Sequence, residues 1–446
     1  MPAPVEPDHG SPALTAGDDE PKGEATALDQ FTASGRRRSE YTLPYEGFST
    51  GDAVVMTGDQ PGALDRRALI SLAAAGTVGM ATRATPAPAP TPSGTTERPV
   101  IVNALGGISD PNLDLPRQTP ALADTDVPGV DDRSVRDALA SGVSAVNMTL
   151  GYVSGPMDPF EYTVASIGAW DKLLRERANH LIKVNSADDI SRAHREGKVG
   201  VFYGFQNTVQ LGDKPQRVDL FANLGVRVIQ LTYNPANAVG DGSMAPQTRG
   251  LTPFGHEVVE RLNVTRVMVD LSHSGEKTCL DAIAASKSPI SINHTGCRAL
   301  TDLPRNKTDA ELRGVAEKGG FVGIYFMPYL TLSGHATPQD VVAHIDHAVN
   351  VCGEDHVGIG TDGEVSEIDD LGAYRARLAA EIAGRAAAGI GATGERADTY
   401  PFVVDLRGPD QFHKLARLLK ARGYSERRID KILGLNFVSY AREIWG

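Results

Sequence analysis

Two histidines and an aspartate stand where three apolar, β-branched runs of the sequence end. His273 follows the run VMVDLS, His294 follows PISIN, and Asp362 follows HVGIGT. Neutral imidazoles with a nearby carboxylate are ligands that zinc or a similar cation accepts. Asp362 could equally be a base that takes a proton from a metal-bound water. A single histidine at a strand end is usually a hydrogen-bonded core residue, but the joint placement of these three favours a site.

Eight short apolar runs, separated by amphipathic segments, must position these residues. Near-continuous apolar strands that alternate with helices indicate a parallel sheet covered on both faces. Eight such units over roughly 250 residues predict an α/β fold of the (β/α)8 TIM-barrel class, in which the chemistry lies at the C-terminal ends of the strands. A doubly wound open sheet is the competing fold, but no glycine-rich phosphate-binding turn follows the first run. The expected strands are 100–104, 144–150, 198–204, 227–233, 267–272, 289–293, 320–325 and 356–361.

Further polar side chains follow the third and fourth expected strands. Gln206 and Asn207 come after the third strand, and Tyr233 and Asn234 stand at the end of the fourth. Amides offer both donors and acceptors, and a tyrosine hydroxyl is a potential acid or oxyanion donor. We therefore expect a polar cluster at one end of the barrel.

Four motifs, in order along the chain, resemble those of the membrane (renal) dipeptidase family of amidohydrolase-type barrels. They are DLSHS (270–274), NHTGCRALTDLPRN (293–306), VGIGTD (357–362) and ILGLNFVSYAREIW (432–445). The resemblance covers roughly residues 100–446. It implies a zinc-dependent peptidase in which two metals share a bridging glutamate, activate a water and cleave dipeptides with a free amine and carboxylate.

The resemblance carries roles over to particular residues. His273 and His294 match the two histidines of one metal position. Asp362 matches the aspartate that touches the other metal and handles the proton. Arg305 matches the arginine that pairs with the substrate carboxylate, a role suited to a planar guanidinium. The alternative for this arginine is that it caps the helix expected to begin near Thr308.

The chain departs from the family pattern at the first metal position. The family opens its first strand end with Asp-x-His-x-Asp, whereas residues 103–107 here read Asn-Ala-Leu-Gly-Gly. Gln206 stands where the bridging glutamate is expected, and an uncharged amide is a poor bridge between two cations. Tyr233 replaces a histidine that faces the substrate. We therefore expect no first metal, and a single zinc ion held by His273, His294 and Gln206.

These observations predict a metal-dependent, single-zinc hydrolase that acts on a dipeptide or related amide with a free carboxylate. Asp362 and Tyr233 are the expected catalytic residues, and Arg305, Asn234 and Asn207 are expected to bind the substrate. Two alternatives stay open. One is a non-hydrolytic enzyme on the same scaffold, such as a lyase, isomerase or transferase, and the other is a metal-free binding protein.

Composition narrows the class of protein further. The formal net charge of −12 argues against nucleic-acid binding, because phosphates would be repelled. The three cysteines, Cys279, Cys297 and Cys352, have no CxxC spacing, so neither a thiolate zinc site nor a redox motif is indicated. The expected partner is a small-molecule substrate with a carboxylate, and a homodimer stays an open option.

The N-terminal hundred residues differ from the rest. Residues 1–55 are rich in Gly, Pro, Asp, Glu and Ser and predict a disordered extension, which a true start at Met56 would remove. Residues 56–98 match a twin-arginine export signal and Pro-rich linker, since the Arg66–Arg67 pair precedes an apolar run too short to span a bilayer. We expect export to the periplasm or outside the cell, with no integral membrane segment in the mature chain. A cytoplasmic location is the alternative, and the dipeptidase-like barrel is expected over 99–446.

Overall fold

The computed structural model of the chain describes residues 98–113, 127 and 129–446. The predicted disordered extension, 1–55, lies outside the described residues. The predicted export signal and linker, 56–98, also lies outside them except for its last residue. Both stay predictions from the sequence. In the described part of the chain, no helix is both long and apolar enough to cross a membrane.

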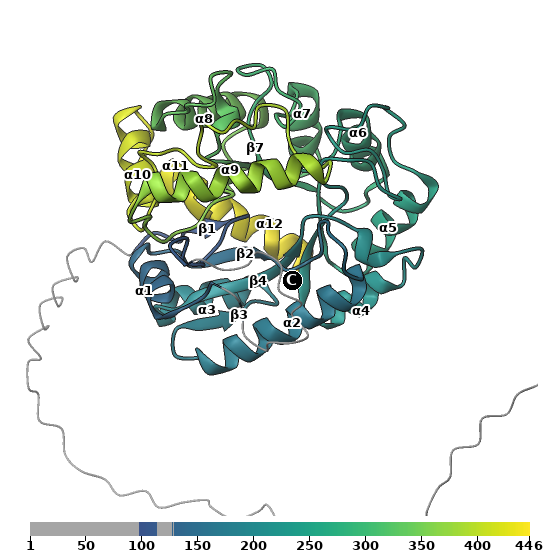
Figure 1. Cartoon of the computed structure of the whole chain (residues 1–446), viewed down its shortest axis with the longest axis horizontal. Coiled ribbons are helices and arrows are strands. Elements are labelled where there is room, and N and C mark those ends of the chain that lie inside the picture. Colours follow the sequence, from purple (N-terminus) through teal and green to yellow (C-terminus); the bar gives the residue numbers. More distant parts are fainter. Residues whose placement is uncertain (1–97, 114–126, 128) are drawn as a thin grey trace, which may run out of the picture. The chain divides into compact units, whose positions relative to one another are not determined.

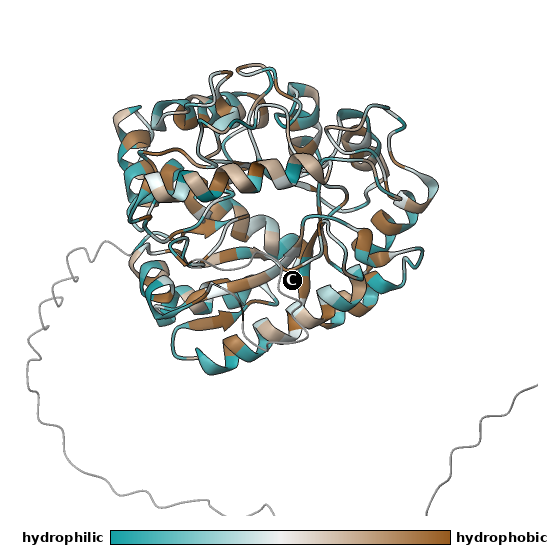
Figure 2. Cartoon of the chain, in the orientation of Figure 1, coloured by the Kyte–Doolittle hydropathy of each residue, from teal (hydrophilic) through white to brown (hydrophobic). Residues whose placement is uncertain are grey.

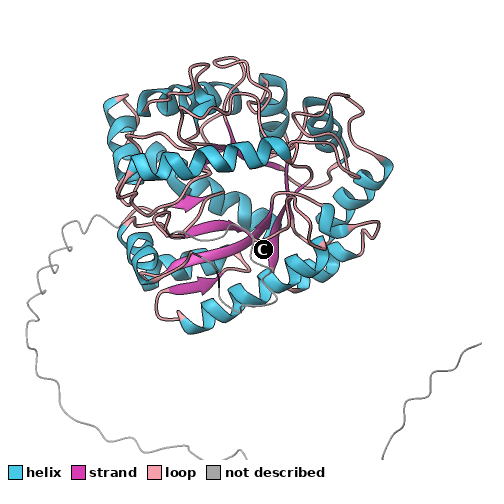
Figure 3. Ribbon diagram, viewed as in Figure 1, coloured by secondary structure: helices cyan, strands magenta, loops and turns pink. Residues whose placement is uncertain are grey.

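The strands form one parallel sheet that curls into a nearly closed barrel (Figure 3). Hydrogen-bonded neighbours run in the order β1-β2-β4-β5-β6-β7-β8-β9, and β3 pairs with β4 outside this path. The backbone N–H of Ala104, after β1, donates to Ile359 O of β9 at 3.0 Å, which joins the first strand to the last. The predicted (β/α)8 barrel is confirmed. The strands are β1 Val102–Asn103, β2 Ala145–Thr149, β3 Leu181–Lys183, β4 Val199–Phe205, β5 Val226–Gln230, β6 Met268–Asp270, β7 Ser291–Thr295, β8 Phe321–Ile324 and β9 Val357–Ile359.

Helices alternate with the strands and surround them (Figure 1). Several begin at the side-chain caps that the sequence supplies, such as Ser186 before α3 and Thr337 before α8. Each cap satisfies a backbone N–H group that the first helical turn leaves without a partner. The helices are α1 Asp132–Ala140, α2 Pro159–Glu176, α3 Ala187–Glu196, α4 Arg217–Asn223, α5 Pro253–Val264, α6 Glu276–Ala285, α7 Asp309–Glu317, α8 Pro338–Cys352, α9 Leu371–Ala387, α10 Gln411–Ala421, α11 Glu426–Asp430 and α12 Asn436–Trp445.

The core lies on both faces of the sheet, because the barrel interior and the helix layer both bury strand side chains. All seven residues of β4 are buried, which is why its sequence reads as a continuous apolar run rather than an alternating one. The C-terminal helix α12 adds aromatic packing, with the Phe437 ring 5.3 Å from that of Phe202 between centroids. The outer helices carry both apolar and polar residues, as their mixed colours in Figure 2 show.

Candidate active site

A cavity of about 840 Å³ opens at the C-terminal ends of the strands. Its walls come from strand ends, from the loop after β9 and from helix α9, which crosses the barrel in Figure 1. The structure brings six of the eight predicted site residues to the wall of this cavity. They are Gln206, Tyr233, Asn234, His273, Arg305 and Asp362.

The DLSHS motif forms a turn that is held by a buried carboxylate. Asp270, the last residue of β6, accepts hydrogen bonds at 3.0 Å from the backbone N–H groups of Ser272 and Asn293. The Ser272 hydroxyl in turn accepts from the backbone N–H of His294 at 3.0 Å. These bonds fix the end of β6 against β7, and they set the positions of both histidines.

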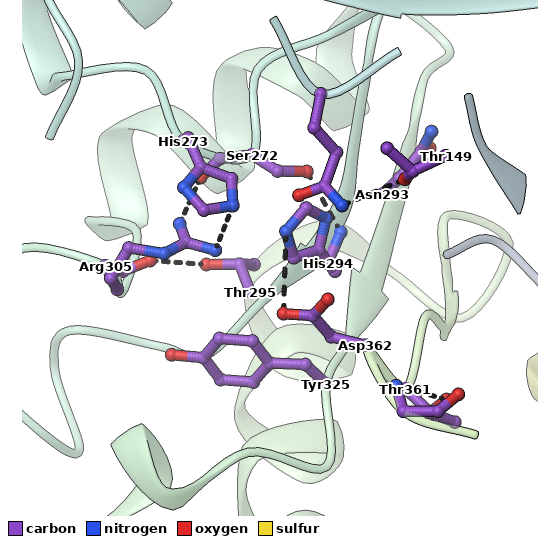
Figure 4. A network of polar contacts seen from close by, with 12 residues as sticks. Thr149, Ser272, His273, Asn293, His294, Thr295, Arg305, Tyr325, Thr361 and Asp362 are labelled. Carbon is purple, nitrogen blue, oxygen red and sulfur yellow. Dashed lines mark hydrogen bonds and ion pairs between the residues drawn. The ribbon is translucent and has the colours of Figure 1, made fainter. Parts of the chain in front are cut away.

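His273 is buried, and both of its ring nitrogens have partners in the chain. Nδ1 lies 2.7 Å from Asn234 Oδ1. Nε2 lies 3.2 Å from a terminal nitrogen of Arg305 (Figure 4). The ring also stacks on Tyr233, with 4.2 Å between centroids. Burial, and next Arg305, hold the pKa of His273 well below its usual value, so the ring is neutral near pH 7.

His294 is fully buried on β7 and has a different environment. Within the described part of the chain, neither ring nitrogen has a hydrogen-bond partner. Its Nε2 atom lies 3.9 Å from Asp362 Oδ2, which is too far for a direct hydrogen bond (Figure 4). A buried polar atom without a partner costs free energy unless water or a ligand satisfies it. The gap between His294 and Asp362 therefore indicates a ligand position.

Asp362 follows β9 in a backbone conformation that residues other than glycine rarely adopt. Its φ angle is +56°, in the left-handed region, and such strain in a non-glycine residue clusters at functional sites. Its backbone N–H donates to Leu105 O at 3.0 Å. Burial raises the pKa of Asp362 to about 6, although the positive charges of Arg305 and Arg385 oppose that shift. A carboxylate with this pKa is suited to accept a proton near neutral pH.

Arg305 is almost completely buried, with 2% of its surface exposed. One terminal nitrogen donates to Ser272 O at 2.6 Å, and the other faces His273. The nearby helix α7 does not depend on it, because Thr308 and Glu311 form a capping box there. The capping alternative for Arg305 is thus not what the structure shows. Since a guanidinium has five N–H bonds, these contacts leave further donors for a ligand in the cavity.

The space at Gly107, where the family pattern would place a ligand of the first metal, is filled by another residue of the chain. A Cβ atom built on Gly107 would collide with the carboxylate of Glu364, so this carboxylate lies where a side chain at 107 would be. Glu364 lines the cavity, and Oε2 accepts from the backbone N–H of Ser109 at 2.7 Å. Burial raises the pKa of Glu364 to about 7. The Gln206 amide is also engaged, since Nε2 donates to Thr149 Oγ1 at 2.9 Å.

Two predicted site residues differ in their access to the cavity, since Tyr233 reaches its wall and Asn207 does not. Tyr233 lines the cavity, and burial raises its pKa, which keeps the phenol protonated and able to donate. Asn207 is buried and does not line the cavity. Its Oδ1 accepts from the side chain of Asn237 at 2.8 Å and its Nδ2 donates to Val153 O at 3.3 Å. Both ends of this amide therefore hold loops in place.

Helix α9 supplies cavity residues that the sequence did not point to. Tyr374, Arg377 and Arg385 all line the cavity. Arg385 Nη2 pairs with Glu395 at 3.0 Å, and its charge acts on Asp362. Residues on both sides of this helix, within the segment 363–410, line the cavity as well. Glu364 was missed as well, although a carboxylate two residues after Asp362 is a usable signal.

The donor set fits the predicted zinc ion poorly. A catalytic zinc site uses three protein ligands with an open fourth position. Among the residues that the structure describes, no group of three or more His, Cys, Asp and Glu side chains could hold a metal ion. His294 and Asp362 have available atoms, and Gln206, whose Nε2 donates to Thr149, offers only its uncharged Oε1 atom. His273 Nε2, however, faces Arg305. The residues present do not fit the ion, and zinc stays a prediction from the sequence.

Comparison with known proteins gives the family. The model of the membrane dipeptidase family (peptidase family M19) matches residues 112–388, which is more than half of the chain. The chain belongs to the membrane dipeptidase family. The resemblance drawn from the four motifs is thereby confirmed.

Two curated relatives are similar to this chain over different shares of their own length. Dipeptidase tcpJ of Claviceps purpurea is 30% identical over 288 residues, which cover 63% of this chain and only 60% of that protein. The uncharacterized protein in the pqqA 5' region of Klebsiella pneumoniae is 27% identical over 304 residues, which cover 66% of this chain and 99% of that protein.

Solved structures agree with the barrel. The amidohydrolase from Pseudomonas aeruginosa is 31% identical, with a TM-score of 0.64, and the match covers 78% of this chain and 97% of that one. The dipeptidase AC, a metallopeptidase, has a TM-score of 0.62 at 22% identity and supports the fold.

Proposed function

We propose that the chain is a dipeptidase-type hydrolase that cleaves an amide bond in a dipeptide or related small compound with a free carboxylate. Membership of the membrane dipeptidase family supports the reaction class. The observation that carries the proposal is the buried, unpartnered His294, 3.9 Å from Asp362 and next to a cavity that also holds Arg305.

In this proposal, the residues of the cavity have separate tasks. The remaining N–H donors of Arg305 bind the substrate carboxylate, because a planar guanidinium matches two carboxylate oxygens. Asp362 accepts the proton of the attacking water and returns it to the leaving amine. Tyr233, whose phenol stays protonated, donates a hydrogen bond to the oxyanion that forms. Helix α9 shields the cavity from bulk water.

The test is product analysis with the full chain. Purified protein is incubated with a panel of dipeptides and N-acylated amino acids, with and without added zinc, and new free amines are quantified by chromatography. We expect release of amino acids by the wild type and much slower release by Asp362→Asn. Release that is equal in both proteins, or absent across the panel, would contradict the proposal.

Ligand binding without turnover is a second candidate, and one observation favours it. His273, a residue that the resemblance assigns to a metal, has its Nε2 atom bonded to Arg305 instead. A binding protein would retain amino-acid derivatives on Arg305 without releasing products. Calorimetry on the same panel would detect that binding where chromatography finds no product.

A further inference from the structure

The orientation of His273 is fixed by a chain of hydrogen bonds that begins at the segment after α9. Asn234 Nδ2 donates to Ile390 O at 2.8 Å, so its Oδ1 atom must face His273. An amide oxygen only accepts, and His273 Nδ1 therefore carries the ring proton. It follows that Nε2 presents a lone pair. A histidine that ligates a metal is arranged in this way, with its second nitrogen donating to an oxygen.

The lone pair of His273 Nε2 is nevertheless already used. Arg305 has only donors, and one of its terminal nitrogens lies 3.2 Å from Nε2. The carbonyl of Ser272 holds the same guanidinium through its other terminal nitrogen, at 2.6 Å. Figure 4 shows the guanidinium against the His273 ring, on the side of Nε2. This cation cannot lose its proton, so it is a permanent positive charge at the ligating atom.

We infer that the Arg305 guanidinium takes the place of a metal cation at His273, so that His273 does not ligate metal in this protein. The charges agree with this assignment. Two neutral imidazoles, one guanidinium and the Asp362 carboxylate form a group that can be charge-balanced without a divalent ion. The inference does not depend on the proposed hydrolysis, since it concerns binding of the metal alone.

Zinc titration of the full, unproteolysed chain tests the inference. Zinc affinity is measured by competition with a chromogenic chelator for the wild type and for Arg305→Met, which removes the charge and keeps much of the side-chain bulk. We expect Arg305→Met to bind zinc at least roughly tenfold more tightly, because a repelling charge has left a partly buried site. Arg298→Met is the matched control, since Arg298 pairs with Glu276 and not with His273, and it should bind zinc as the wild type does.

Two further variants keep the test decisive if Arg305→Met does not fold. Arg305→Lys retains the positive charge and should leave zinc affinity as low as in the wild type. His273→Ala in the wild-type background should not weaken zinc binding, because His273 is not a ligand. A tenfold or larger loss of zinc affinity in His273→Ala would overturn the inference, and so would equal zinc affinity in the wild type and a folded Arg305→Met.

Discussion

The two sides of the barrel mouth differ in which residues they hold and how those residues are paired. On the side of β1 and β4, the side chains that the family resemblance places at a first metal are absent, and the Glu364 carboxylate fills the space at Gly107. On the side of β6 and β7, both histidines are present, and Arg305 is the partner of His273. One side thus lacks the expected ligand residues, and the other holds them in contacts with other side chains. Residue types at strand ends thus do not establish a metal site unless their partners are also known.

The largest expected effect is at Asp362, which follows β9 and whose carboxylate faces His294 of the β6–β7 side. Asp362→Asn removes the proposed base without changing the shape of the side chain, and we expect kcat to fall by roughly 10² to 10⁴. Gln206→Leu, on the other side of the mouth, is the matched comparison and should reduce kcat much less. Steady-state kinetics on a substrate found in the panel would check both. An equal reduction of kcat in the two variants would contradict a functional difference between the two sides.

Arg305→Lys tests the dual role of the arginine on the β6–β7 side. A point charge cannot copy the fork that contacts Ser272 O and His273 together and, in the proposed function, also binds a substrate carboxylate. We expect KM to rise roughly 10- to 100-fold, with a smaller change in kcat. The measurement is the pair of constants on one substrate, with circular dichroism to verify the fold. An unchanged KM would restrict Arg305 to a structural role.

Gly107→Asp tests the filled space on the β1 side. The new side chain would collide with Glu364, and we expect a loss of about 1–3 kcal/mol in the free energy of unfolding. Gly107→Asp combined with Glu364→Gly moves the carboxylate to position 107 and should recover most of that loss. Urea denaturation of the wild type, both single variants and the double variant gives the free energies of unfolding. Additive losses in the double variant would show that Glu364 does not fill the space at 107.

A further expected effect is the dependence of stability on pH. The folded pKa of Asp362 is raised to about 6, so the folded state favours the protonated carboxyl. Its contribution to stability is therefore full below the unfolded pKa, about 3.9, and is lost as pH rises through about 6. Asp362→Asn should match the wild type at pH 4 and exceed its free energy of unfolding by up to about 3 kcal/mol at pH 8. Denaturation of both proteins at pH 4 and pH 8 gives the free energies of unfolding. A difference between the proteins at pH 4 as large as at pH 8 would contradict this prediction.

The sequence was sufficient for the barrel, because each central strand is buried on both faces and reads as an apolar run. It also predicted that polar residues at several strand ends would share one region, since parallel strands end on the same side. The short β3 was not predicted. Only three residues long, two of them partly exposed, it carries Lys183 and lacks a sustained apolar pattern.

The sequence could not predict how the site residues are paired. Nothing local distinguishes Asn207, whose amide ties loops together, from Asn234, which orients His273. The contact between Arg305 and His273 joins residues 32 positions apart and depends on the turn at Ser272. The cavity residues of α9 were missed for a similar reason, because a surface helix after the last strand gives no sign of the direction in which it folds back.

A crystal structure of the full chain grown with zinc would test the central claim most directly. Anomalous diffraction at the zinc edge locates the ion without reference to activity. We expect no zinc within bonding distance of His273 Nε2, and Arg305 in its present contact with that atom. A strong zinc peak bonded to His273 Nε2, with the guanidinium of Arg305 displaced, would contradict the account.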